Sequence, residues 1–92
     1  MSVRQYIITG RVQGVGFRNF TATVARRLGV RGTVRNLSDG SVECVATADA
    51  GRLARLEAEL RRGPSFSRVE EVSQAELPDT WLNSLPAGFE IT

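Results

Sequence analysis

The amino-acid sequence predicts an α+β sandwich in which two helices cover one face of an antiparallel sheet. Three observations support this fold class: two segments have apolar residues at helical spacing, β-branched segments flank each of them, and a hairpin turn signal separates the two middle segments. The length of 92 residues fits one domain, residues 1–92, with a single apolar core.

The first half of the chain is expected to form a strand, a helix and a second strand. Residues 5–10 (QYIITG) are β-branched and aromatic and run into a glycine-rich turn. From residue 17 to residue 28 apolar side chains recur every three or four positions, and Gly29 ends this helix. Residues 30–36 (VRGTVRN) again have the composition of a strand.

The second half repeats this order. The turn signal Ser38-Asp39-Gly40 precedes an expected strand at residues 41–47. Asp49 is suited to cap a helix over residues 50–61, which Gly63 and a proline end. Three further segments follow: a strand at 67–75, a loop at 77–88 and a short strand at 89–92.

The connections between these elements predict which parts of the chain meet. A strand–helix–strand unit crosses over in the right-handed sense, so the first two strands run parallel and their carboxyl ends share one sheet edge. This places the turn after residue 10 beside Asn36. The order βαββαβ, with a short C-terminal fifth strand, is that of a ferredoxin-like α/β sandwich.

A glycine-spaced motif, residues 10–18 (GRVQGVGFR), lies where the first strand meets the first helix. Glycines allow successive N–H groups to point into one concavity, and a helix N-terminus attracts anions. The planar guanidinium of Arg18 can grip two phosphate oxygens. We therefore expect a phosphate, or a sulfate in its place, to bind the following residues: Gln13, Gly14, Val15, Gly16, Phe17 and Arg18.

Other phosphate motifs do not fit this segment. The chain contains no lysine, which a nucleotide P-loop requires, and the glycines lack the dinucleotide spacing. Positive charge surrounds the motif, because residues 1–38 carry seven arginines and no acidic residue. The remainder carries five arginines and ten acidic residues, and the whole chain has a formal charge of +2. Such an asymmetry is typical of a site that attracts a small anion.

Composition argues against several classes of protein. With no histidine and one cysteine the chain has no usual metal-ligand set, so no metal is expected. Cys44 lies within a strand and is expected in the core. No segment is apolar enough to span a membrane and no signal peptide is evident, which favours the cytoplasm. For a small chain a monomer is the simplest expectation.

Two ordered motifs resemble the signatures of the acylphosphatase family. The first is residues 10–18; the second is residues 32–36 (GTVRN) followed by 39–43 (DGSVE). The segments RRGP at 61–64 and FEI at 89–91 are also similar, so the resemblance spans essentially the whole chain. This chain departs from the family at Thr33, where an aromatic residue is usual.

The resemblance implies an activity and roles for two residues. The expected reaction is hydrolysis of an acyl phosphate to a carboxylate and inorganic phosphate, without metal or cofactor. Arg18 matches the family's phosphate-binding arginine, and Asn36 matches its water-positioning asparagine. The substrate is then a small molecule, and no nucleic acid or membrane is an expected partner.

Two alternative functions remain at this level. The same βαββαβ order serves RNA-recognition domains, although these stack bases on sheet aromatics and only Tyr6 is an aromatic in the expected sheet centre. The other alternative is a non-catalytic phosphate-binding domain, related to the acylphosphatase-like domains within larger maturation proteins. It would bind phosphate at Arg18 without hydrolysing an acyl phosphate.

Overall fold

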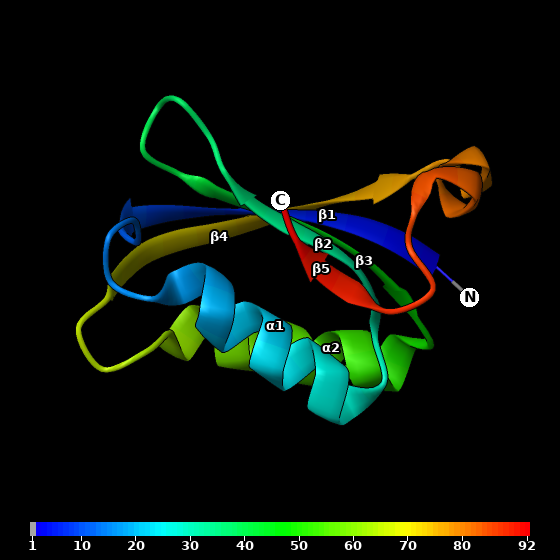
Figure 1. Cartoon of the computed structure of the whole chain (residues 1–92), viewed down its shortest axis with the longest axis horizontal. Coiled ribbons are helices and arrows are strands. Elements are labelled where there is room, and N and C mark those ends of the chain that lie inside the picture. Colours follow the sequence, from blue (N-terminus) through cyan, green and yellow to red (C-terminus); the bar gives the residue numbers. More distant parts are fainter. Residues whose placement is uncertain (1) are drawn as a thin grey trace.

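The structure, a computed structural model, describes residues 2–92 and places two helices on one face of a five-stranded sheet (Figure 1). The elements in chain order are β1 (Ser2–Arg11), α1 (Phe17–Leu28), β2 (Arg31–Asn36), β3 (Val42–Ala48), α2 (Ala50–Arg62), β4 (Arg68–Leu77), the 3-10 helix η1 (Asp79–Ser84) and β5 (Phe89–Ile91). The predicted βαββαβ order with a short fifth strand is confirmed.

The strands lie in the order β4-β1-β3-β2-β5. The four longer strands pair antiparallel, as predicted, but β5 pairs parallel with β2, so the sheet is mixed. The reason is the path of the chain after β4. That strand ends at the edge where β1 and β2 begin, and the connection enters β5 from this same edge, so β5 must run in the direction of β2.

Two strands are longer than the sequence predicts. β1 begins at Ser2 rather than at residue 5, and β4 continues to Leu77. Pairing on both sides explains the extension of β1, because Val3 is aligned with Thr47 of β3 and with Leu77 of β4. Local composition undervalues such residues, since their neighbours in the sheet fix their conformation.

The expected loop at 77–88 contains the 3-10 helix η1, which lies on the side of the sheet away from the helices (Figure 1). Arg31 of β2 holds the end of this segment against the sheet, because it donates hydrogen bonds to the carbonyls of Leu85 and Pro86, at 3.2 and 2.9 Å. Val3 and Val45 are buried in the sheet. They have the opposite strand parity to the core residues facing the helices, so this second face is partly covered as well.

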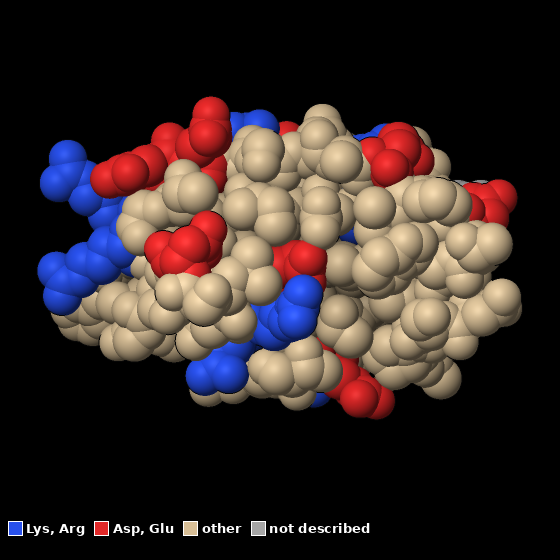
Figure 2. All heavy atoms as spheres, turned by 90° about the horizontal axis from the view of Figure 1, so that it is seen from above, with Lys and Arg blue, Asp and Glu red and all other residues tan. Residues whose placement is uncertain are grey.

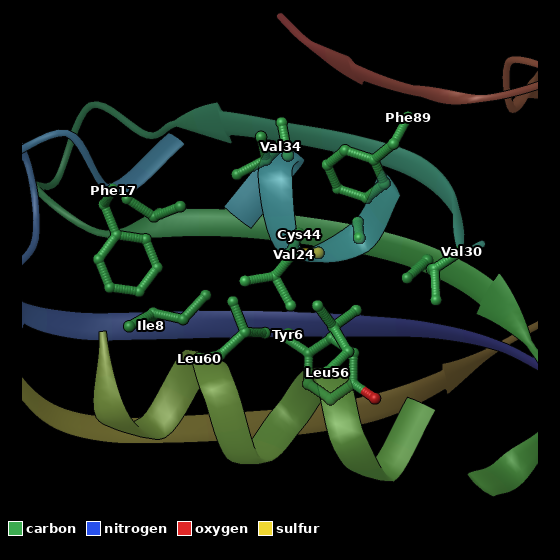
Figure 3. Close-up of a cluster of buried hydrophobic side chains, with 14 of the residues drawn as sticks. Tyr6, Ile8, Phe17, Val24, Val30, Val34, Cys44, Leu56, Leu60 and Phe89 are labelled. Atoms are coloured by element: carbon green, nitrogen blue, oxygen red, sulfur yellow. The ribbon is translucent and has the colours of Figure 1, made fainter. Parts of the chain in front are cut away.

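The main core lies between the helices and the sheet (Figure 3). Each layer supplies apolar side chains to it: Phe17 and Val24 from α1, Leu56 and Leu60 from α2, and Tyr6, Ile8, Val34, Cys44 and Phe89 from the strands. Cys44 is buried at its centre, as predicted. Replacing a buried leucine such as Leu56 with alanine is expected to cost about 2–5 kcal/mol.

The sheet register brings together the two segments that the sequence expected to meet. Ile8 of β1 and Asn36 of β2 are both aligned with Val42 of β3, so β1 and β2 run parallel and end at one edge. From this edge the chain continues into residues 12–16 after β1 and into residues 37–41 after β2.

Candidate active site

Glycines in left-handed conformations shape the loop of residues 12–16, which joins β1 to α1. Gly14 and Gly16 have φ of 75° and 80°, and a Cβ on either would meet nothing within 4 Å. The backbone conformation therefore requires these glycines, and the space beside them is open. Gly10 differs, because it lies at a bulge in β1 where a Cβ would collide with the carbonyl of Arg68. Its role is close strand packing.

The N-terminus of α1 is left without a cap. Gly16 offers no side chain, and the first turn contains no acidic residue. Within residues 2–92, no backbone carbonyl outside α1 accepts a hydrogen bond from the N–H groups of residues 14–18. These donors, together with the positive end of the helix, are available to an anion.

Arg18 is exposed on the first turn of α1. Seven of the twelve arginines have partners in the protein: Arg4, Arg35, Arg52, Arg61 and Arg62 form ion pairs, and Arg26 and Arg31 donate to backbone carbonyls. Of the five others, Arg18 is the one that lines the pocket described below. Among the described residues Arg18 has neither kind of partner. Its guanidinium is thus free to form a bidentate pair with a ligand.

One pocket of about 170 Å³ unites the two sequence motifs. Its lining consists of Val12, Gly14, Gly16, Phe17, Arg18, Asn19, Asn36 and Ile91. Arg18 of α1 and Asn36 of β2 thus lie in one pocket, although β3 separates β2 from β1, the strand that leads into α1. Of the other expected phosphate-binding residues, Gly14, Gly16 and Phe17 line the pocket, whereas Gln13 and Val15 do not.

The side chains of Gln13 and Val15 have other contacts. The Gln13 amide donates two hydrogen bonds of 2.8 Å, to the carbonyls of Leu37 and Ser41. It therefore ties the loop to the turn that directly follows Asn36. Val15 is partly buried and packs against the core, which fixes the loop from the other side.

The turn after Asn36 is itself well fixed. The N–H of Leu37 donates to the carbonyl of Ser41 at 2.9 Å, and the N–H of Ser41 donates to the Asp39 carboxylate at 3.0 Å. The Ser41 hydroxyl also donates to Asp39, and these hydrogen bonds lower the pKa of that carboxyl. Asn36 therefore projects from a defined position at the end of β2.

The sequence did not indicate that Asn19 and Ile91 belong to the pocket. Asn19 follows Arg18 on the first turn of α1, so its helical position was a usable signal. Ile91 comes from β5, and only the parallel pairing of β5 with β2 brings it here. No local pattern in the sequence reveals that pairing.

The described residues give no support for a cysteine nucleophile, a metal site or a membrane-spanning helix. Complete burial raises the pKa of the Cys44 thiol, which makes it a poor nucleophile. No group of three or more His, Cys, Asp or Glu side chains is placed to hold a metal ion between residues 2 and 92. Across the same residues, no helix is both long and apolar enough to cross a membrane.

The basic residues of the first half do not form one patch. Arg4 pairs with Glu76 at 2.9 Å and Arg35 with Glu43 at 2.7 Å. Figure 2, which looks onto the sheet face away from the helices, shows acidic and basic side chains intermingled. This face of the sheet therefore presents no extended positive surface to an anion.

Comparisons with known proteins show the family to which this chain is similar. The sequence profile of the family described as Acylphosphatase matches residues 4–91. The curated protein "Acylphosphatase" of Nitratidesulfovibrio vulgaris strain DP4 is 48% identical over 88 residues, which cover 88% of each chain. The crystal structure of acylphosphatase from Bacillus subtilis has a TM-score of 0.92 and 34% identity, and the match covers 100% of this chain and 99% of that one.

A third match is to part of a much larger protein. The structure of full-length HypF "in the phosphate- and nucleotide-bound form" matches with a TM-score of 0.82 and 29% identity, covering 99% of this chain but 12% of HypF. With the profile match over most of its length and a curated relative of nearly equal extent, this chain belongs to the acylphosphatase family, whose reaction is the hydrolysis of acyl phosphates.

Proposed function

We propose that this chain hydrolyses acyl phosphates by direct attack of water on phosphorus. In this mechanism the N–H groups of residues 13–18 and the Arg18 guanidinium hold the phosphoryl group, and Asn36 positions the attacking water. The observation that carries the proposal is the single pocket lined by Arg18, Asn36 and the glycine loop.

The binding half of the mechanism follows from unused donors. An incoming phosphoryl group meets the free N–H groups at the start of α1 and the unpaired guanidinium of Arg18. These donors are charged or aligned with the helix dipole, and they lie on a loop that Gln13 and Val15 fix. Such preorganised donors stabilise the negative charge that develops on the phosphoryl oxygens during transfer.

The leaving group explains why no general acid is needed. An acyl phosphate releases a carboxylate, whose conjugate acid has a pKa of about 4, so it departs without a proton. The amide oxygen of Asn36 accepts a hydrogen bond from water and adds no negative charge that would repel the phosphate. As the new P–O bond forms and the bond to the acyl oxygen breaks, a phosphoryl oxygen takes the proton of the attacking water.

Hydrolysis of acetyl phosphate and benzoyl phosphate in EDTA tests this proposal. We expect activity in the native chain and a loss of at least about a hundredfold in kcat/KM for both Arg18→Ala and Asn36→Ala. Matched controls are Arg27→Ala, at the last turn of the same helix, and Asn83→Ala, exposed on η1; both should retain activity. Undiminished activity in folded Arg18→Ala would rule out the mechanism.

The match to HypF bears on the second candidate, a non-catalytic phosphate-binding domain. The fold occurs there as 12% of a larger chain, whereas this chain and its curated relative each cover 88% of the other. The name of that relative, "Acylphosphatase", favours an enzyme. Calorimetric binding of inorganic phosphate without hydrolysis of either acyl phosphate would instead favour the binding domain.

The RNA-binding alternative loses the one aromatic that the sequence offered for base stacking in the sheet centre. Tyr6 points into the core, where its hydroxyl donates to the carbonyl of Leu53 at 3.4 Å, and its side chain is fully buried. It offers no platform for stacking a base. The monomeric state and the cytoplasmic location stay predictions, which sedimentation of the purified chain and cell fractionation test.

A further inference from the structure

Ile91 lines the pocket that holds Arg18 and Asn36, and it has no part in the proposed phosphate chemistry. Ile91 is 37% exposed, and it is one of three large hydrophobic side chains with substantial exposure within residues 2–92; the others are Phe66 and Trp81. The other apolar residues of the pocket, Val12 and Phe17, are almost fully buried, at 1% and 2% exposure. Ile91 therefore supplies most of the apolar side-chain surface that a ligand in this pocket can touch.

Ile91 is held in place from two directions. It is aligned with Val34 of β2, and the N–H of the next residue, Thr92, donates to the carbonyl of Val34 at 2.9 Å. On the helix side, Arg26 of α1 donates two hydrogen bonds to the carbonyl of Phe89, at 2.9 and 3.1 Å. An exposed apolar side chain on so well fixed a strand presents a defined surface.

The register also sets how Ile91 lies relative to Asn36. Ile91 is level with Val34, two residues before Asn36, so the two side chains are offset by about 6.6 Å along the strand direction on neighbouring strands. In-line displacement requires the water and the departing acyl oxygen on opposite sides of phosphorus. A phosphoryl group between these residues would receive its water from Asn36 and direct its acyl group toward Ile91.

We propose that Ile91 forms the acyl subsite and determines specificity, favouring acyl phosphates with an apolar acyl group. This inference rests on the proposed function, because it takes the phosphoryl group to lie at Arg18. Contact with Ile91 removes apolar surface of the acyl group from water, so kcat/KM should rise with acyl size. Since phosphate itself has no acyl group, its binding should not depend on Ile91.

The experiment measures kcat/KM for acetyl, butyryl and benzoyl phosphate, together with competitive inhibition by inorganic phosphate. In the native chain kcat/KM should rise along this series. In Ile91→Ala the ratio of benzoyl to acetyl phosphate should fall about tenfold, while the inhibition constant for phosphate stays unchanged. The matched control is Phe66→Ala, which removes an 82% exposed aromatic outside the pocket and should leave the ratio unchanged.

A second, conservative variant keeps the test decisive if Ile91→Ala does not fold. Ile91→Val keeps the β-branched side chain that suits a strand, and it should lower the ratio by a smaller factor. An unchanged ratio in Ile91→Val and in folded Ile91→Ala would overturn the subsite. Failure of the native chain to hydrolyse any of the three substrates would instead overturn the proposed function, so the two failures are distinguishable.

Discussion

The two helices of this molecule begin in opposite ways. α2 starts at Asp49, whose carboxylate accepts a hydrogen bond of 2.9 Å from the backbone N–H of Arg52. The same carboxylate forms an ion pair with the guanidinium of Arg52. α1 starts at Gly16, which has no side chain to accept such a bond, and its first turn carries Arg18 instead of an acid. One helix satisfies its own N-terminus, and the other leaves it open.

This difference teaches how a helix N-terminus becomes a binding site. The N-termini of α1 and α2 have the same unpaired N–H groups and the same helix dipole. At α2 the protein itself supplies the negative charge, through the carboxylate of Asp49. At α1 the protein supplies only positive groups, so the missing partner must come from outside. The absence of a cap at Gly16 is thus as informative as the presence of Arg18.

The largest effect on activity is expected when α1 is given a capping carboxylate like that of α2. In Gly16→Asp the side chain would place negative charge among the N–H groups that we propose bind phosphate, and we expect kcat/KM to fall by at least about a hundredfold. The matched control is Gly16→Asn, because asparagine also tolerates the left-handed conformation but carries no charge. Equal losses in both variants would mean that strain, not charge, causes the effect.

A milder change keeps the positive charge and alters its shape. In Arg18→Lys the planar fork is replaced by a single ammonium group, so we expect kcat/KM to fall about ten- to a hundredfold. The loss should exceed that of Arg27→Lys, which changes an arginine at the other end of α1. Full activity in Arg18→Lys would show that a point charge suffices at this site.

Inorganic phosphate that binds at the uncapped N-terminus of α1 should also raise the stability of the folded chain. Phosphate at a hundred times its dissociation constant should stabilise the native chain by about 2.7 kcal/mol, since it binds the folded state alone. Thermal unfolding with and without phosphate measures the shift. Gly16→Asp should lose it, and Asp49→Ala should keep it; a shift that persists in Gly16→Asp would place the anion elsewhere.

The smallest effect is expected at the capped helix. Asp49→Ala should lower the Tm by about 3–5 °C at neutral pH without changing kcat/KM. The hydrogen bond from the Arg52 N–H, with that from its side chain, lowers the pKa of Asp49 below its ordinary value of 3.8. The cap therefore contributes fully at neutral pH, and its contribution fades as the pH falls through the lowered pKa.

Thermal unfolding measured over a range of pH tests this expected loss of the cap's contribution in acid. The difference in Tm between the native chain and Asp49→Ala should shrink below pH 3.8 and be constant above about pH 6. A difference that grows on acidification would contradict the assignment of the cap to the ionised carboxylate.

Local signals predicted the helices better than the strands. The bounds 17–28 for α1 are confirmed and those for α2 are confirmed to within one residue, because helical periodicity and glycine stops are local. The parallel pairing of β5 and the length of β1 depend on distant partners instead. The same holds for the site: the glycine motif and its residue type indicated Arg18, the family resemblance indicated Asn36, and nothing indicated Ile91.

Gln13 illustrates this limit of local reasoning. Its place in the glycine motif indicated phosphate contact through its backbone, and nothing local indicated that its side chain reaches Leu37 and Ser41. These partners lie 24 and 28 residues further along the chain. Hydrogen bonds over such separations follow from the strand register, which only the assembled sheet defines.

The position of β3 between β1 and β2 also governs when the site can exist during synthesis. Arg18 and Asn36 both lie within the first 36 residues. The strand that leads to Arg18, β1, and the strand that ends at Asn36, β2, are not neighbours, and they are aligned only through Val42 and the rest of β3. A nascent chain that has emerged through Asn36 therefore carries both side chains without a pocket. Hydrolysis should begin only after β3 has left the ribosome, so activity in a series of stalled chains would report the moment of sheet closure.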